Sequence, residues 1–238
     1  MIRFGKLALG AAALLGLTSF ATAADLPTVK GVAAAPVEMW SPWMVRVRAI
    51  AVIPDESARI RNAVTNAAIA PASVNISNTV VPEVDISYFF TKNIAVEAIC
   101  CITPHKIRGT GAIAALGQIG KTTLFPPTVM LQYHFTEMGA FKPYVGIGLN
   151  YTKFLRERTG PNYVGLNIRD SWGVAGQIGF DYMIDRHWGI NFDVKKIYME
   201  PRATVSVAPG VLAPGAVPVS AKVKINPWII GTGVTYRF

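Results

Sequence analysis

The chain ends in Gly231-Thr232-Gly233-Val234-Thr235-Tyr236-Arg237-Phe238, so an aromatic ring is its last side chain. Counting back in twos from Phe238 gives Tyr236, Val234, Thr232 and Ile230, which form one mostly apolar face of a final strand. The ends of water-soluble domains are usually poorly ordered, and a large ring gains little there. A strand that closes a barrel in lipid can place the ring at the membrane–water boundary. The terminus therefore predicts a transmembrane β-barrel.

The first 23 residues have the pattern of a secretory signal peptide. Arg3 and Lys6 supply the positive start, residues 7–17 form an apolar run, and Ala21-Thr22-Ala23 gives a small-residue cleavage site. The run is shorter than a spanning helix needs. We expect residues 1–23 to be a signal peptide, 24–39 an N-terminal periplasmic segment and 40–238 the barrel.

The composition is apolar without being continuously apolar. The chain is 51% hydrophobic, yet after Ala23 no stretch of about 18 residues lacks charged or strongly polar groups. Gly, Pro and Asn separate short runs, and no helical period is sustained. A lipid-facing barrel needs this pattern because every second side chain points inward. A soluble two-sheet sandwich could be equally rich in apolar residues.

Alternating segments indicate an all-β fold with eight strands. The segments are 43–52, 81–90, 94–102, 128–135, 141–152, 171–184, 188–198 and 223–238. Tight turns follow the second, fourth and sixth segments, and longer loops follow the first, third, fifth and seventh. A soluble sandwich has no reason for this alternation. An eight-stranded antiparallel transmembrane β-barrel does, with short periplasmic turns and long extracellular loops.

Outward aromatic side chains form two groups, as the two interfaces of a bilayer require. The group at the turn end is Trp43, Tyr88, Phe90, Tyr133, Phe135, Phe141, Phe180, Tyr182, Trp188, Tyr236 and Phe238. The group at the loop end is Tyr151, Phe154, Trp172, Tyr198 and Trp228.

Four segments together resemble the outer-membrane protein W (OmpW) family. They are Leu-Phe-Pro-Pro-Thr-Val-Met-Leu-Gln-Tyr-His-Phe (124–135), Lys-Pro-Tyr-Val-Gly-Ile-Gly-Leu-Asn-Tyr-Thr (142–152), Ser-Trp-Gly-Val-Ala-Gly-Gln-Ile-Gly-Phe-Asp-Tyr (171–182) and Asn-Pro-Trp (226–228). The similarity covers residues from about 40 to 238, and the chain departs from the family mainly in its Ala- and Pro-rich external loops. The resemblance implies an eight-stranded barrel in the bacterial outer membrane and a narrow channel associated with small hydrophobic molecules.

The inward side chains can be sorted by depth because strand direction alternates. Near the turns they are polar and predict a charged plug of Arg46, Arg48, Glu83, Asp85, Glu97, Asp181, Asp193 and Lys195. Near the loops they are apolar and predict a hydrophobic, ligand-binding lumen of Ile50, Val52, Val81, Ile99, Met130, Ile197, Met199 and Ile229. Ordinary side-chain filling is the alternative, because eight strands enclose little space.

We therefore expect passive uptake of a small hydrophobic solute, which enters the apolar lumen and leaves sideways into the membrane because the plug is costly to cross. The alternative is a structural or adhesive barrel that uses loops 53–80 and 199–221 as contact surfaces. An enzyme is not expected, because no serine nucleophile motif accompanies His105. Histidine and cysteine residues lack metal-ligand spacing, and adjacent Cys100 and Cys101 predict no disulfide framework. No cofactor is expected.

The net charge of +9 favours anionic partners. In a secreted chain we expect membrane lipid and lipopolysaccharide phosphates rather than nucleic acid, although a solvated loop surface would carry the same charges. Tyr236 and Phe238 resemble the assembly signal of outer-membrane barrels, which implies a contact between the last strand and the barrel-assembly machinery.

Overall fold

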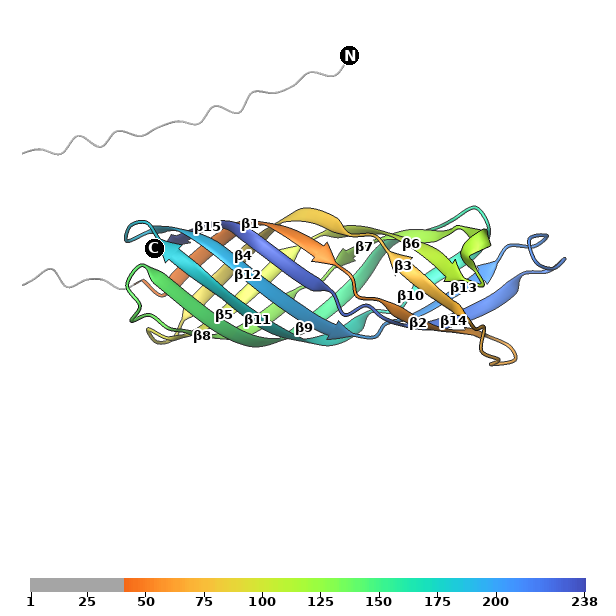
Figure 1. The fold of residues 1–238 in the computed structure, drawn as a ribbon, viewed down its shortest axis with the longest axis horizontal. Helices are drawn as coiled ribbons and strands as arrows, with labels where there is room; N and C mark the ends of the chain where they lie inside the picture. Colours follow the sequence, from red (N-terminus) through yellow and green to blue (C-terminus); the bar gives the residue numbers. More distant parts are fainter. Residues whose placement is uncertain (1–40) are drawn as a thin grey trace, which may run out of the picture. The chain divides into compact units, whose positions relative to one another are not determined.

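The computed structural model describes residues 41–238 (Figure 1). The predicted signal peptide, residues 1–23, and the predicted periplasmic segment, residues 24–39, lie outside the described residues. Within residues 41–238 no helix is long and apolar enough to cross a membrane.

Eight antiparallel strands close into a barrel, which confirms the predicted fold class. In barrel order they are β1 (Trp43–Ile53), β4 (Thr79–Phe89), β5 (Ile94–Cys101), β8 (Thr128–His134), β9 (Phe141–Thr159), β11 (Ser171–Met183), β12 (Trp188–Met199) and β15 (Trp228–Arg237). The closing pair is β15 with β1, with Val234 opposite Val47. Closure matters in lipid because it leaves no unpaired sheet edge.

Strand β1 illustrates the internal zones of the barrel. Its alternate residues Met44, Arg46, Arg48, Ile50 and Val52 are all buried and point inward. The order of side chains along this one face is apolar, charged, charged, apolar, apolar. The residues between them face outward, and such outward positions on the barrel are mostly large apolar side chains. Because successive side chains of a strand point to opposite faces, the alternation along β1 determines which residues face lipid and which form the inner zones.

Two aromatic belts bound the lipid-facing wall. Trp172 and Tyr182 are exposed at opposite ends of β11, and the ten residue steps from one to the other span roughly 25 Å vertically at the usual strand tilt. Trp172 contacts Tyr151 at 4.9 Å between ring centroids. The prediction for Phe154 is wrong: it is buried, because it has the same parity as inward Thr152.

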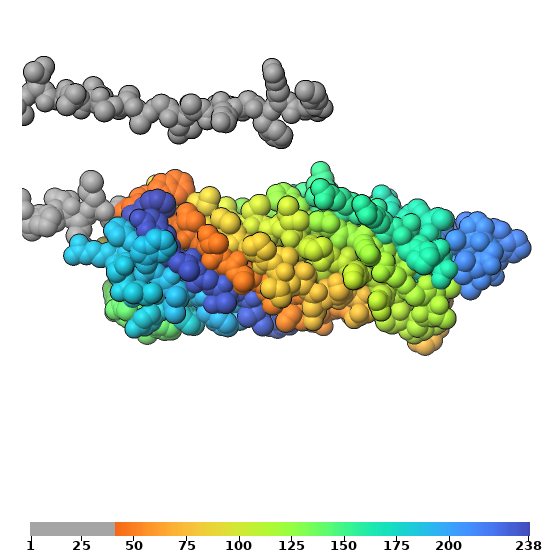
Figure 2. Space-filling model, turned by 90° about the horizontal axis from the view of Figure 1, so that it is seen from above, coloured from red at the N-terminus to blue at the C-terminus, as the bar shows by residue number. Residues whose placement is uncertain are grey.

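The segments predicted as long loops are largely strands, which extend the barrel beyond its upper belt (Figure 1). They are β2 (Ser57–Asn62), β3 (Ala72–Ile76), β6 (Thr103–Gly111), β7 (Gln118–Phe125), β10 (Tyr163–Ile168), β13 (Arg202–Val207) and β14 (Val217–Lys224), with one 3-10 turn, η1 (Ala114–Leu116). Figure 2 shows the hairpin around residue 210, in blue, at the far end of this extension.

The predicted eighth strand, 223–238, is two strands. Val223 belongs to β14, and β15 begins only at Trp228. The break falls at Asn226, whose φ of 34° leaves the extended region, and at Pro227, which cannot donate to a ladder. The predicted fifth strand is longer than expected and continues to Thr159 as β9.

The extension consists of two sheets that face each other. One has the order β3-β6-β7-β9, and the other has the order β10-β13-β14-β2. Between residues 41 and 238 no backbone ladder joins β2 to β3 or β9 to β10. Side chains bridge the β2–β3 seam instead. The Glu56 carboxylate accepts hydrogen bonds from Asn75 Nδ2 at 2.9 Å and Ile76 N at 3.0 Å, and Ser73 Oγ accepts one from Ala58 N at 3.2 Å.

Candidate functional site

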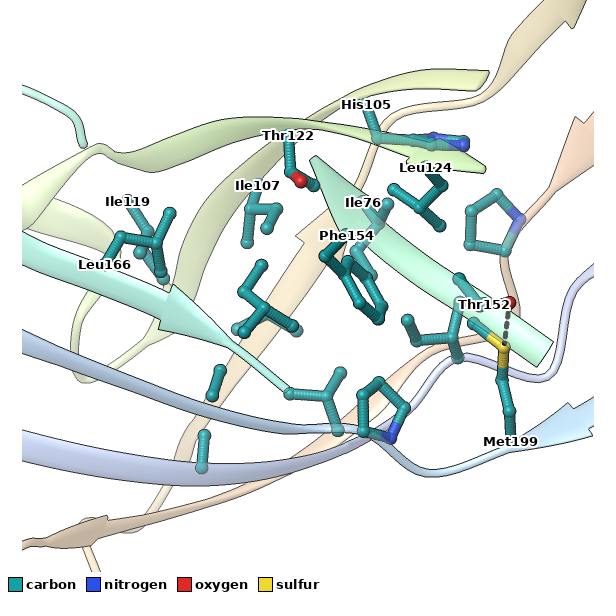
Figure 3. Close-up of a pocket in the computed structure, with 18 of the residues that line it drawn as sticks. Ile76, His105, Ile107, Ile119, Thr122, Leu124, Thr152, Phe154, Leu166 and Met199 are labelled. Carbon is teal, nitrogen blue, oxygen red and sulfur yellow. Dashed lines mark hydrogen bonds between the residues drawn. The ribbon is translucent and has the colours of Figure 1, made fainter. Parts of the chain in front are cut away.

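An apolar cavity of about 110 Å³ lies between the two sheets of the extension and the top of the barrel (Figure 3). Every element of the extension contributes to its wall, which includes Ile60 from β2, Leu124 from β7 and Val205 from β13. A closed apolar cavity of roughly 150 Å³ can bind one benzene-sized molecule. This cavity is therefore suited to a single small apolar group and offers few hydrogen-bond partners.

The predicted lumen residues divide into two sets. Five of them line the cavity: Ile50, Val52, Ile197, Met199 and Ile229. Val81, Ile99 and Met130 are buried in the same apolar cluster without lining the cavity.

Most of the cavity wall comes from segments that were predicted to be loops. Ile76, Ile107, Ile119, Leu124, Phe154 and Leu166 surround the space in Figure 3. A period-two signal was present in one of these segments: Val217, Val219 and Ala221 alternate with polar or Pro residues and pack against the core, and the pattern continues into the predicted eighth strand with Val223 and Ile225. Neighbouring Pro and Gly residues favoured a loop for this segment, so the alternation was not interpreted as a strand.

Most of the few polar groups in the wall are bonded to the protein, but the buried Tyr163 hydroxyl has no hydrogen-bond partner among the described residues. Thr152 Oγ1 donates to Asn150 Oδ1 at 2.7 Å and lies 3.5 Å from Met199 Sδ. His105 is buried in β6, with Nδ1 2.7 Å from the Ser77 carbonyl oxygen. Burial lowers the pKa of His105, and the bond to Ser77 offsets part of that effect. A neutral imidazole keeps the cavity wall uncharged at neutral pH.

All eight predicted plug residues are buried directly below the cavity, and they pair with one another. Arg46 holds Asp181 through two contacts, 3.0 Å from Nε and 2.6 Å from Nη2, and it also pairs with Glu97. Gln132, inward on β8, donates to Glu97 at 2.7 Å and to Gln177 at 2.9 Å. The network thereby crosses the barrel from wall to wall.

Arg48 is the centre of the second half of the plug. Its guanidinium lies 2.5 Å from Glu83 and 2.6 Å from both Asp85 and Asp193. Lys195 Nζ lies 2.9 Å from Glu83 and 3.5 Å from Asp193. The plug therefore contains three cations and five carboxylates, all buried from solvent, and each cation contacts more than one carboxylate.

Aromatic side chains close the barrel below the plug. Tyr144 stacks on His134 with 4.8 Å between ring centroids, and Arg46 Cζ lies 4.8 Å from the Tyr144 ring centre. Phe89 packs beside His134 and forms a small buried cluster with Met44 and Ala95. The lower barrel therefore lacks room for an open path. Within residues 41–238 no group of three or more His, Cys, Asp or Glu is placed to hold a metal ion.

Comparison with known proteins gives the same architecture. The OmpW family model matches residues 42–238. Outer-membrane protein y4mB of Sinorhizobium fredii is 44% identical over 89% of this chain and 85% of its own length. Outer membrane protein W of Vibrio cholerae is 36% identical over 91% of this chain and 99% of its own length.

Among solved structures, the outer membrane protein OprG of Pseudomonas aeruginosa aligns with a TM-score of 0.75 and 27% identity. The alignment covers 84% of this chain and 97% of OprG. The fold, the lipid-facing wall and the relatives place the protein in the bacterial outer membrane. The chain belongs to the OmpW family.

Proposed function

We propose that this protein takes up small hydrophobic molecules passively through the apolar cavity. The observation that carries the proposal is the order of the zones: an almost wholly apolar cavity faces the extracellular end, and a buried plug of ion-paired side chains closes the barrel beneath it. An apolar solute gains by leaving water for the cavity. It cannot continue downward without disrupting buried ion pairs, which costs several kcal/mol.

The proposed exit is sideways, through the β2–β3 seam. The seam lies above the Val52–Thr79 pair, the last pair of the β1–β4 ladder, near the upper belt. Side chains close it rather than a backbone ladder, chiefly through Glu56. Residues 63–71 connect β2 to β3, whereas only residues 160–162 connect β9 to β10 across the other seam. The longer connection folds back on β2 through backbone hydrogen bonds from Asn62 N to the Ala67 carbonyl oxygen and from Ile69 N to the Ile60 carbonyl oxygen. The proposed separation is therefore at β3 itself, where side chains make the link to β2.

Replacing Met199 with Lys is expected to slow uptake of an apolar solute about 10-fold or more, because a charge placed in an apolar cavity must be desolvated or must draw in water. Uptake of a radiolabelled single-ring hydrocarbon by proteoliposomes measures the effect, and Ile50→Lys serves as a second variant. Met199→Leu, which keeps the site apolar, should retain the wild-type rate. Unchanged uptake in folded Met199→Lys and Ile50→Lys would favour a structural or adhesive barrel instead.

Closing the seam covalently is expected to stop exit. Ala58→Cys and Ser73→Cys place two thiols where Ala58 N and Ser73 Oγ are now 3.2 Å apart, in a background of Cys100→Ala and Cys101→Ala. The oxidised variant should take up the hydrocarbon at least 10-fold more slowly than the same variant after reduction, because separation of β2 and β3 is then blocked. Each single-cysteine variant is the control. Equal rates before and after reduction would reject this exit while leaving the cavity proposal standing.

The last strand is proposed to present the signal to the barrel-assembly machinery. Tyr236 contacts Trp188 and Phe238 at 4.7 and 4.9 Å between ring centroids, and the Phe238 ring is exposed. An exposed terminal ring beside the closing strand is available to a partner before β15 joins β1.

A further inference from the structure

The outward face of the sheet β10-β13-β14-β2 carries a row of three cations on three neighbouring strands. Lys222 of β14 lies directly opposite Arg59 of β2 on one side and directly opposite Arg202 of β13 on the other. All three side chains are exposed. Like charges directly opposite each other destabilise a sheet, so this basic row is unfavourable unless something neutralises it.

No acidic side chain on the sheet provides that neutralisation. Strands β2, β10, β13 and β14 contain no Asp or Glu among their described residues. Beside the basic row a hollow of about 550 Å³ is lined by Arg59, Arg61, Arg169, Arg202 and Lys222, together with Asn66, Asn167, Thr204 and Ser220. The backbone N of Arg169 donates to the Arg202 carbonyl oxygen at 2.9 Å, which fixes Arg169 next to the row.

The height of the basic row on the molecule indicates which part of the membrane it can reach. Ile53 pairs with Trp228 of the upper aromatic belt, and Arg59 follows six residues later. At about 3.3 Å per residue the row is at most about 20 Å along the strand from the belt, and less vertically because strands tilt. It therefore lies where the polar headgroups of the outer leaflet begin and extend outward. Arg side chains bind phosphate through paired hydrogen bonds, and hydroxyl and amide groups suit sugars.

We propose that the basic row of Arg59, Lys222 and Arg202, with Arg61 and Arg169 beside it, binds phosphate groups of lipopolysaccharide in the surrounding outer leaflet. The opposite face of the same sheet forms the cavity wall through Ile60, Val205 and Val223. Bound lipid would thus brace the sheet that borders the seam. This site is separate from the cavity, so it does not depend on uptake.

The test uses the purified full-length barrel in detergent and the triple variant Arg59→Gln, Arg202→Gln and Lys222→Gln. Its matched control removes three exposed charges from the other sheet that do not lie opposite another cation, with Arg108→Gln in β6 and Lys153→Gln and Arg156→Gln in β9. Binding of lipopolysaccharide and of the same lipid after phosphatase treatment is measured by native mass spectrometry and by titration at rising salt. The wild-type protein should prefer the phosphorylated lipid, and its affinity should fall with salt.

The basic-row variant should bind phosphorylated lipopolysaccharide about 10-fold or more weakly, and the control variant within about 3-fold of wild type. Without lipid at low salt, the basic-row variant should unfold in urea no more easily than the wild type, because repulsion is removed. If it fails to fold, Lys222→Gln alone, at the centre of the row, gives the same comparison. Equal losses in both triple variants, or equal binding of the dephosphorylated lipid, would overturn the proposal.

Discussion

Replacing Gly233 with Val is expected to prevent the barrel from closing. Gly233 of β15 lies opposite Arg48 of β1 in the closing pair of strands. A Cβ at this position would be 2.1 Å from the Val47 carbonyl oxygen and 2.6 Å from Arg48 Cα. The clash is with backbone, so no change of rotamer can relieve it. The cost should exceed the roughly 1–3 kcal/mol typical of an overpacked core.

Heat-modifiable mobility on gels, which separates closed barrels from unfolded chains, measures the effect after refolding into detergent. We expect almost no closed species for Gly233→Val. Val234→Ile is the matched control, since this neighbouring residue is exposed on the lipid face and the added methylene leaves the closing pair free. Comparable refolding of the two variants would show that the β1–β15 contact tolerates a side chain and that Gly233 does not lie opposite Arg48.

Replacing Arg48 with Met is expected to destabilise the folded barrel by about 3–5 kcal/mol, the usual cost of removing one partner from a buried ion pair. Arg48 contacts Glu83, Asp85 and Asp193 within 2.6 Å. Without it, Lys195 is the remaining cation in contact with this group, and it reaches Glu83 and Asp193. Urea unfolding in lipid vesicles, followed by tryptophan fluorescence, gives the free energy of unfolding.

Arg158→Met is the control for this measurement. It removes the same side chain from an exposed position on β9, where surface substitutions usually change stability little. If Arg48→Met unfolded at the same urea concentration as Arg158→Met, the plug would hold enough water to screen its charges. A solute could then cross the plug at little cost, and a sideways exit would be unnecessary.

The part of the protein that touches lipid could be predicted from the sequence. Along β1 and β11 every second residue faces hydrocarbon and must be apolar. This requirement applies to each outward residue independently of the others, so it can be seen in the sequence alone. Strand number, direction and the inward position of Arg46, Arg48 and Glu83 followed from this period and from the tight turns. The residue at which β15 begins could not be predicted from this period. The apolar pattern alone would continue the strand, but Asn226 and Pro227 interrupt the ladder of hydrogen bonds.

The contents of the interior depend on the closed fold and could not be predicted in the same way. Apolar and polar side chains also alternate in one of the long connecting segments, from Val217 to Ala221. The connecting segments form strands only by packing against one another. Ile60 and Leu124 therefore line the same cavity although they are distant in sequence. The choice of partners in the plug, such as Arg46 with Asp181, is set by how closure of the barrel brings the inward side chains of β1 and β11, which β15 and β12 separate, within reach of each other. Periodicity sets which face a side chain occupies; closure of the barrel determines which side chain it meets there.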